Sequence, residues 1–347
     1  MSQFIHPNFK LNGQSFDLLE LLALALQWSK EGMLYEKETG NFLLDWLNNE
    51  THLMVTTSGS TGKPKKIYLS KKAMKASAEA TASYFHLKPK DTALLCLSAQ
   101  YIAGKMMLVR ALQIGMHIDV IEPSTMPLQR LTKSYDFAAM VPLQVAQSLS
   151  DLSKIKTLLI GGAKLQPELV SKLAQLPTQI YETYGMTETI THIAVKRVGE
   201  SNFSLLPHVK ITVDERNCLV IHAPFISEEA IVTNDVVEVC SPTQFKLKGR
   251  WDNVINSGGI KIFPEELEDV LSTYITSRFF IASLPDALLG EKVVLVIEAF
   301  PFEINSKLFE NLTTYQKPKA IYFVPTFIET PTQKINRKKT LELIQPN

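Results

Sequence analysis

A nine-residue segment of the sequence combines the residue types that hold phosphate groups. It consists of Thr57, Ser58, Gly59, Ser60, Thr61, Gly62, Lys63, Pro64 and Lys65. Glycines let a backbone close around phosphate oxygens, while amides and hydroxyls donate hydrogen bonds and lysines supply positive charge. The common G-x-x-x-x-G-K-[ST] loop is excluded, because Pro64 follows Lys63. A surface turn is the ordinary alternative, but the segment directly follows an apolar strand expected over residues 52–56, which favours phosphate binding.

Two further segments carry residue types suited to a flat ring and to a charged ligand. The first is the run Tyr184, Gly185, Met186, Thr187 and Glu188. The second is Gly161, Gly162 and Ala163, which follows a short apolar run. Glycines there would let a flat ring approach the backbone. The ordinary alternatives are a solvated glutamate in the first segment and a simple turn in the second.

Several polar segments follow in the second half of the chain. They are Thr233-Asn234-Asp235, Gly249-Arg250-Trp251-Asp252-Asn253, Ser257-Gly258-Gly259 and Pro331-Thr332-Gln333-Lys334-Ile335-Asn336-Arg337. An aspartate after an edge strand could hold ribose hydroxyls, and a Gly-Arg loop at a domain boundary suits a hinge. Polar turns and a basic C-terminal tail are the alternatives.

The elements that must position these residues alternate between helices and short apolar strands. We expect helices over residues 15–50 (broken at 30–32), 71–85 and 104–114, and strands over 93–97, 117–121, 137–141 and 157–160. This alternation predicts an α/β domain with a mostly parallel sheet.

The pattern changes near residue 205, where short strands predict a small β-rich subdomain over about 205–248. We expect its strands at 209–213, 218–222, 230–233 and 236–239. A C-terminal α+β domain follows, with helices at 264–273 and 305–314 and strands at 279–282, 293–299 and 320–324. The pattern therefore predicts two domains, residues 1–250 and 251–347.

Composition narrows the class of protein. The 347 residues carry 36 Lys+Arg and 35 Asp+Glu, and this balance argues against nucleic acid as a partner. Three scattered cysteines and seven scattered histidines predict neither a disulfide framework nor a zinc site. The N-terminus does not have the pattern of a signal peptide, and no apolar run is long enough to span a bilayer. We expect a cytoplasmic protein without membrane insertion; a homodimer is left open.

Taken in order, the segments resemble the motifs of the adenylate-forming superfamily: acyl-CoA synthetases, luciferases and peptide-synthetase adenylation domains. The similarity rests on four motifs, T-S-G-S-T-G-K-P-K, Y-G-M-T-E, G-R-W-D-N and P-T-Q-K-I-N-R. It implies the adenylate-forming enzyme fold, shortened at its N-terminus. Residues 1–250 would then form the domain that binds ATP and the acyl group, and residues 251–347 a mobile C-terminal domain. Gln333 and Lys66 stand where the family often has glycine, and we treat both as variation on an active enzyme.

The resemblance implies a reaction in two halves. A carboxylate attacks the α-phosphate of ATP to give acyl-AMP and pyrophosphate, and a thiol, usually CoA, then displaces AMP. Positioning and charge neutralisation do most of this work. The 57–65 segment would wrap the terminal phosphates, Thr187 would contact the α-phosphate and Glu188 would bind Mg²⁺. Lys334 would balance the charge that develops in the first half.

The same resemblance assigns the nucleoside and thiol contacts. The predicted adenine and ribose residues are Gly161, Gly162, Ala163, Tyr184, Gly185, Asp235 and Arg250. Asp252 would be the hinge, and rotation about it would bring Ser257, Gly258 and Gly259 to the CoA channel in place of Lys334.

The segment 98–105, with its I-A-G run, looks like that of the 2-succinylbenzoate–CoA ligases of menaquinone (vitamin K2) biosynthesis. That substrate is an aromatic dicarboxylate, whose second carboxylate needs a buried cation or donors. The predicted acyl-pocket residues are Tyr101, Gly104, Lys105 and His192. A solvated lysine and a core histidine are the ordinary alternatives.

Other functions stay open at this point. The acid could be another aryl or short-chain acid, and the acceptor could be a carrier-protein thiol. A degenerate nucleotide-binding protein is the alternative outside enzymes, and the presence of Thr187, Glu188 and Lys334 argues against it.

Overall fold

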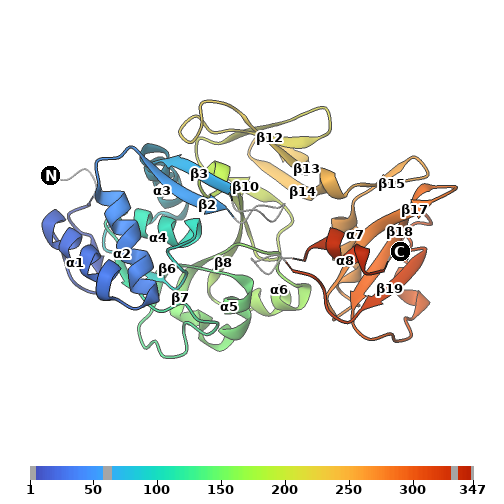
Figure 1. Ribbon diagram of the computed structural model, residues 1–347, viewed down its shortest axis with the longest axis horizontal. Helices are drawn as coiled ribbons and strands as arrows, with labels where there is room; N and C mark the ends of the chain where they lie inside the picture. The colour runs from blue at the N-terminus through green and yellow to red at the C-terminus, as the bar shows by residue number, and fades with distance from the viewer. Residues whose placement is uncertain (1–4, 58–64, 330–334, 345–347) are drawn as a thin grey trace.

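One large mixed sheet organises the first 250 residues (Figure 1). The computed structural model describes residues 5–57, 65–329 and 335–344. Six of the sheet's strands are parallel: β1 (Lys10–Leu11), β5 (His117–Val120), β4 (Thr92–Leu95), β6 (Tyr135–Met140), β7 (Ile155–Ile160) and β8 (Gln179–Gly185). The antiparallel strands continue it: β9 (His192–Arg197), β10 (Phe203–Leu205), β14 (Gln244–Arg250), β13 (Ile231–Ser241), β12 (Cys218–His222) and β11 (Lys210–Val213). The predicted α/β class is confirmed.

Helices pack around the parallel half of this sheet. They are α1 (Leu18–Glu31), α2 (Leu34–Leu47), α3 (Lys71–Phe85), α4 (Ile102–Ile114), α5 (Pro142–Gln147) and α6 (Pro167–Leu173), with 3-10 turns η1 (Leu149–Lys154) and η2 (Thr187–Thr189). Helix α1 starts at a capping box, in which Asp17 and Glu20 each accept a hydrogen bond from the other's backbone amide. The predicted break between the first two helices is confirmed, since α1 ends at Gly32.

A two-stranded hairpin, β2 (His52–Thr57) and β3 (Lys65–Ser70), lies beside the large sheet. Its last pair joins Thr57 to Lys65. The hairpin thus brings together the two ends of the predicted phosphate-binding segment.

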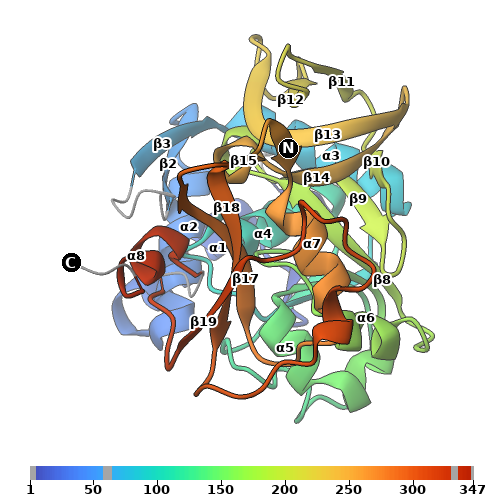
Figure 2. The same cartoon turned by 90° about the vertical axis from the view of Figure 1, so that its right-hand side faces the viewer.

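A second, five-stranded sheet forms the C-terminal unit, residues 251–344 (Figure 2). Its strands are β15 (Ile255–Ser257), β16 (Ile260–Ile262), β17 (Phe279–Asp286), β18 (Gly290–Glu298) and β19 (Ala320–Val324). Its helical segments are η3 (Trp251–Asn253), α7 (Pro264–Leu271), η4 (Ser306–Phe309) and α8 (Arg337–Glu342). In the part of the chain that is described, no strand pairing joins the two sheets. The chain crosses between them through η3, close to residue 250.

Three local expectations need correction. The strands expected at 230–233 and 236–239 are one strand, β13, with a register shift between Val236 and Val237. The β-rich region continues the large sheet through β9 and β10, because backbone pairing is unbroken there. The helix expected over 305–314 is only the short η4, since the threonines near its end are weak helix formers and Thr313 turns onto the Gln316 side chain.

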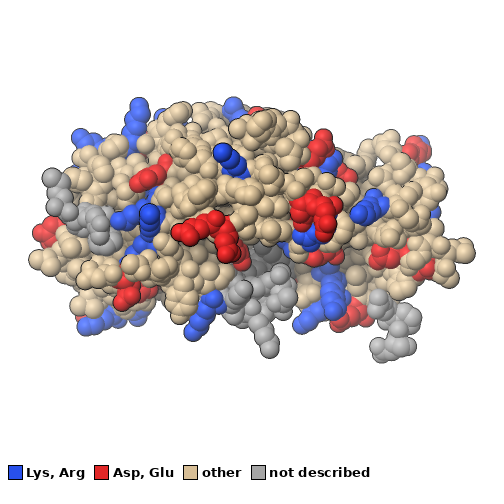
Figure 3. Space-filling model, turned by 90° about the horizontal axis from the view of Figure 1, so that it is seen from above, with Lys and Arg blue, Asp and Glu red and all other residues tan. Residues whose placement is uncertain are grey.

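Basic and acidic side chains are interspersed on the face shown in Figure 3. Among the described helices, none combines the length and the apolar content needed to cross a bilayer.

Candidate active site

The predicted nucleotide residues meet where parallel strands β6, β7 and β8 end. Ligands of open α/β sheets bind outside these carboxyl ends. The amide of Gly161 donates to the carbonyl of Met140 at 3.3 Å, and a Cβ on Gly161 would lie 2.9 Å from Oγ1 of Thr183. Gly162 has φ +92°, a conformation that favours glycine. Glycine is therefore favoured at both positions, and the adenine contact predicted for Gly161, Gly162 and Ala163 stays a prediction.

Tyr184, Asp235 and Arg250 come together in the structure, although they lie far apart in the sequence. The Tyr184 hydroxyl donates to Oδ2 of Asp235 at 2.6 Å, and Nη1 of Arg250 contacts Oδ1 at 3.2 Å. Asp235 pairs with Arg250 across β13 and β14. Burial, followed by the charge of Asp235, raises the pKa of Tyr184, so the phenol stays protonated and acts as a donor.

The surroundings of Tyr184 and Asp235 differ from the expectation in two ways. Asp235 does not follow an edge strand, because β13 is paired on both sides, by β12 and β14. The Tyr184 ring is only 8% exposed and packs against Phe203 and Phe245 at centroid distances of 5.8 and 5.2 Å. Its packing fixes the hydroxyl toward Asp235, a positioning role that sequence reasoning did not include.

The turn after β8 carries Thr187, which is half-buried, and Glu188. Gly185 has no room for a side chain, because a Cβ would lie 2.3 Å from the carbonyl oxygen of Thr191. Thr189 closes the turn by accepting from the amide of Met186 at 2.9 Å. Glu188 is exposed.

The exposed carboxylate of Glu188 fits a magnesium ligand. Mg²⁺ in phosphate-transfer sites is usually held by one or two carboxylates together with substrate phosphates. Within the described residues, no cluster of three or more His, Cys, Asp or Glu side chains is placed to bind a metal by itself.

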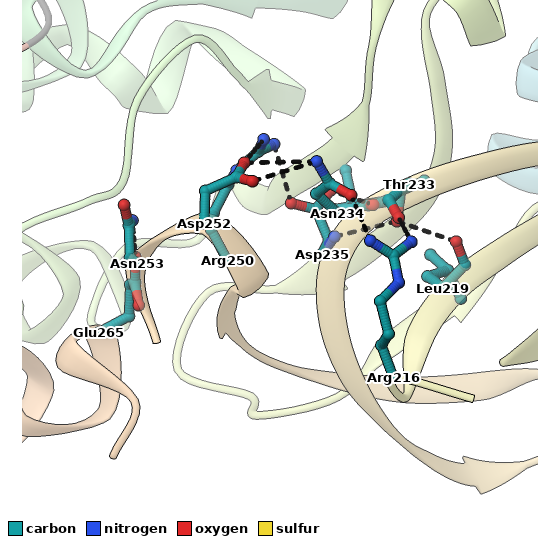
Figure 4. Close-up of polar contacts among 10 residues, drawn as sticks. Arg216, Leu219, Thr233, Asn234, Asp235, Arg250, Asp252, Asn253 and Glu265 are labelled. Atoms are coloured by element: carbon teal, nitrogen blue, oxygen red, sulfur yellow. Dashed lines mark hydrogen bonds and ion pairs between the residues drawn. The ribbon is translucent and has the colours of Figure 1, made fainter. Parts of the chain in front are cut away.

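Asp252 lies in η3 between the two sheets (Figure 4). Nη2 of Arg250 contacts its Oδ2 at 2.7 Å, and Nδ2 of Asn234 donates to both of its carboxylate oxygens. On the other side of the crossing, Asn253 donates to Oε1 of Glu265 at 2.5 Å. The predicted hinge residue is thus contacted from the large sheet, and its neighbour is contacted from α7.

The loop predicted to line the CoA channel joins β15 to β16. Ser257 is buried, and Gly258 and Gly259 have φ of +60° and +82°. Nothing lies within 4 Å of a Cβ built on Gly259. In this structure, the backbone conformation is the reason that glycine is favoured there.

Two predicted groups lie outside the described residues. They are Ser58, Gly59, Ser60, Thr61, Gly62 and Lys63 of the predicted phosphate-binding segment, together with Lys334, the predicted catalytic lysine. An isolated bridge between Glu329 and Ile335 flanks the position of Lys334.

The predicted acyl segment packs against α2. Tyr101 is 55% exposed, and Gly104 is required by the fold, because a Cβ would lie 2.3 Å from the carbonyl oxygen of Ser98. Nζ of Lys105 donates to the carbonyl of Ala99 at 2.6 Å and lies 5.5 Å from the centre of the Phe42 ring. Burial lowers the pKa of Lys105. Lys105 therefore already has partners within its own loop and on α2.

A different cation, Arg110, is a buried charge that sequence reasoning missed. It is 2% exposed in the middle of α4, and its Nε and Nη2 have no hydrogen-bond partner within the described part of the chain. Among the same residues, the hydrogen-bond acceptor for Nη1 is the sulfur of Met107, at 3.8 Å. Burial lowers the pKa of Arg110 to about 10, which leaves it charged at neutral pH. An arginine within the apolar run 106–112 was the signal that could have identified it.

His192 adjoins this arginine behind the Y-G-M-T-E turn. Its register partner across β8 and β9 is Gly185, and its Nε2 lies 3.4 Å from Oγ1 of Thr81. Burial, reinforced by the charge of Arg110, lowers the pKa of His192 well below its usual value. The imidazole is therefore neutral at neutral pH, and Arg110 is the charged member of this pair of neighbours.

Comparison with known proteins identifies the family. The model of the family described as AMP-binding enzyme matches residues 22–221. The chain belongs to this family. A crystal structure of an acyl-CoA synthetase (AMP-forming)/AMP-acid ligase II-like protein from Dyadobacter fermentans is 34% identical, covers 93% of this chain and 98% of its own, and has a TM-score of 0.63. These matches confirm the family predicted from the motifs, and with it an AMP-forming ligase.

The names of curated relatives state a particular substrate. The 2-succinylbenzoate–CoA ligase of Salmonella typhimurium is 25% identical over 335 residues, which cover 90% of this chain and 73% of the relative. A solved structure of wild-type Escherichia coli MenE with a bound analogue of OSB-AMS has a TM-score of 0.76 at 21% identity, covering 99% of this chain and 96% of that one. At this identity the likeness concerns the fold, and it agrees with the predicted fold class.

Proposed function

We propose that this AMP-binding enzyme is an ATP-dependent 2-succinylbenzoate–CoA ligase. Curated relatives across most of the chain bear that name. The observation that carries the substrate class is Arg110, a buried guanidinium with two unpartnered nitrogens among the described residues. Leaving buried donors unsatisfied costs free energy, whereas an arginine fork matches a carboxylate well. An acid with a second carboxylate would supply that partner.

The roles of the other residues follow the chemistry of the two half-reactions. An oxygen of the reacting carboxylate forms a bond to the α-phosphorus of ATP as the bond to pyrophosphate breaks. Tyr184, Asp235 and the Gly161–Ala163 backbone would orient the nucleoside, while Thr187 would donate to the α-phosphate. Lys334 would neutralise the charge that builds up on the phosphate, and bound Mg²⁺, held by Glu188, would shield the phosphates.

The second half-reaction requires the thiol of CoA to reach the acyl carbon. The sulfur forms a thioester bond as AMP leaves. The domain division 1–250 and 251–347 would serve this step, with Asp252 as the hinge and Ser257–Gly259 as the loop that reaches the pantetheine channel after rotation.

ATP–pyrophosphate exchange with Mg²⁺ tests this proposal. The acids are 2-succinylbenzoate, benzoates, short and medium fatty acids and amino acids, each assayed again with CoA for thioester. We expect exchange and thioester with 2-succinylbenzoate, and no exchange in Lys334→Ala. If exchange occurred only with a different acid, the assignment of 2-succinylbenzoate as the substrate would be overturned. Exchange without formation of a thioester would point to a carrier-protein thiol as the acceptor. Nucleotide binding without any exchange would overturn the ligase itself.

A further inference from the structure

Asn234 connects the hinge residue Asp252 to the large sheet (Figure 4). Its Nδ2 donates to Oδ1 and Oδ2 of Asp252 at 3.2 and 3.4 Å. Asn234 lies on β13, directly before Asp235, whereas Asp252 lies in η3 after the large sheet has ended. Any rotation that carries η3 away from β13 must break these two contacts.

Arg216 determines which way the Asn234 amide faces. Its Nη1 donates to Oδ1 of Asn234 at 3.0 Å, and its Nη2 reaches the carbonyl of Thr233 at 3.4 Å. Because a guanidinium only donates, the amide oxygen must face Arg216 and the amide nitrogen must face Asp252. Asp214 in turn holds Arg216, through Nε at 2.8 Å and Nη2 at 2.7 Å.

Trp251 adds a second contact between this cluster and the crossing. The guanidinium carbon of Arg216 lies 5.9 Å from the centre of the Trp251 ring. Nζ of Lys261, on β16 of the C-terminal unit, lies 4.7 Å from the same ring. The ring therefore has one cation from each side of the crossing near it.

The orientation held in this way places α7 beside the nucleotide-binding edge. Lys164, the residue after Gly161–Ala163, pairs with Asp269 of α7, and Lys248 pairs with Glu266 at 3.1 Å. Gly258 of the thiol loop has its amide bonded to the carbonyl of Leu289 within the C-terminal unit, and it is α7 rather than this loop that carries the ion pairs to Lys164 and Lys248. This arrangement suits the first half-reaction rather than thiol attack.

We propose that Arg216 and Asn234 are positioning residues that hold the hinge in the orientation for adenylation. The inference rests on the proposed two-step function. Neither residue touches the reacting atoms in this assignment; they act through Asp252. Their contacts must break before the thiol loop can approach, so they set the balance between the two half-reactions.

Asn234→Asp is the sharpest variant, because it keeps size and the acceptor for Arg216 but removes the donor to Asp252. Asn234→Ala removes both contacts, and Arg216→Lys keeps charge but loses the fork. The control is Thr243→Ala, at the exposed turn between β13 and β14 and away from the hinge.

The two half-reactions are measured separately, as pyrophosphate exchange and as CoA-dependent consumption of preformed acyl-AMP. For Asn234→Asp we expect exchange to fall about tenfold while the thiol step is unchanged or faster, since one charged hydrogen-bond contact is worth about that factor. Arg216→Lys should lower the rate of exchange by a smaller factor, and Thr243→Ala should have the wild-type rate in both half-reactions. Equal changes in both steps, or none, would overturn the proposal.

Limited trypsin digestion separates this inference from the proposed function. Lys248 and Arg250 are cleavage sites at the crossing. Asn234→Asp should be cut there faster than wild type, and Thr243→Ala should not, whichever acid is the substrate. Equal rates of cleavage in Asn234→Asp and wild type would overturn the positioning role. If wild type showed no ATP–pyrophosphate exchange with any acid, only the proposed ligase function would be overturned.

Discussion

The hydroxyl of Tyr184 donates a hydrogen bond of 2.6 Å to Oδ2 of Asp235, across 51 residues of sequence. This contact joins the Y-G-M-T-E turn, at the end of a parallel strand, to the T-N-D segment in the antiparallel half of the sheet. Arg250 holds the other carboxylate oxygen. Asp235 is therefore oriented before any nucleotide binds, with a donor on each of its oxygens.

Tyr184→Phe should weaken ATP binding without weakening acid binding. The substitution removes one hydrogen bond to a charged group, worth about 1.5–3 kcal/mol, and leaves the ring packing in place. We expect the KM for ATP to rise about tenfold, with the KM for the acid unchanged, measured by pyrophosphate exchange. A proportional rise in both constants would show that the hydroxyl supports the fold in general rather than orienting Asp235.

Arg110→Met should remove binding of an acid with two carboxylates. Loss of one partner of a buried charge pair typically costs about 2–5 kcal/mol, so the KM for 2-succinylbenzoate should rise at least thirtyfold. Arg110→Lys should recover part of this loss, because it restores charge without the planar fork. Initial rates of thioester formation over a range of acid concentrations give these constants.

The two mono-acid analogues of 2-succinylbenzoate, each lacking one carboxylate, provide the matched control. For the analogue that keeps the reacting carboxylate, wild type and Arg110→Met should differ little. If the variant impaired this analogue as strongly as the dicarboxylate, Arg110 would be a packing residue of α4 instead of a substrate contact.

The elements that follow from local sequence were predicted closely. Helix α3 spans the expected residues 71–85, because Ser70 caps its start with a side-chain contact to the amide of Ala73 and His86 ends it in a left-handed conformation. Strands β12 and β19 also have the expected bounds. In each case, apolar spacing and the residues at the ends determine the element.

The predictions that were wrong or incomplete concern segments where side chains of the site or hinge interrupt an apolar pattern. Thr233, Asn234 and Asp235 divided β13 into two predicted strands, yet their polar side chains serve Asp252 and Tyr184 within a continuous strand. Arg110 was missed for a related reason, because its meaning depends on burial and on its neighbour His192, which lies 82 positions later in the printed sequence. Spacing within one segment cannot give contacts of that kind.

Arg337→Met should destabilise the C-terminal unit. Nη2 of Arg337 lies 2.9 Å from Oε2 of Glu268, and Nη1 donates to the carbonyl of Ile281, so one side chain joins α8 to α7 and β17. Burial raises the pKa of Glu268, and Arg337 opposes that shift. Because the pair is partly solvated, we expect a loss of about 2 kcal/mol in the free energy of unfolding by urea.

A double-mutant cycle with Glu268→Gln isolates this pair. If the ion pair is the cause, the double variant should be less destabilised than the sum of the two single variants, with a coupling of about 1 kcal/mol. Additive losses would assign the effect of Arg337→Met to its packing on Phe280, whose ring centre lies 5.6 Å from the guanidinium carbon.

His192 should make stability depend on pH in the acidic range. Its folded pKa lies well below 6.5, while in the unfolded chain it is near 6.5. As pH falls below about 6.5, the unfolded chain therefore binds a proton that the folded protein excludes, and stability falls by up to about 1.4 kcal/mol per pH unit. His192→Asn removes this contribution, so the difference in unfolding free energy between wild type and variant should narrow from pH 7.5 to pH 5.5. Urea unfolding at these two values and at pH 6.5 measures it, and parallel pH dependences would mean that His192 takes up its proton in the folded protein as well.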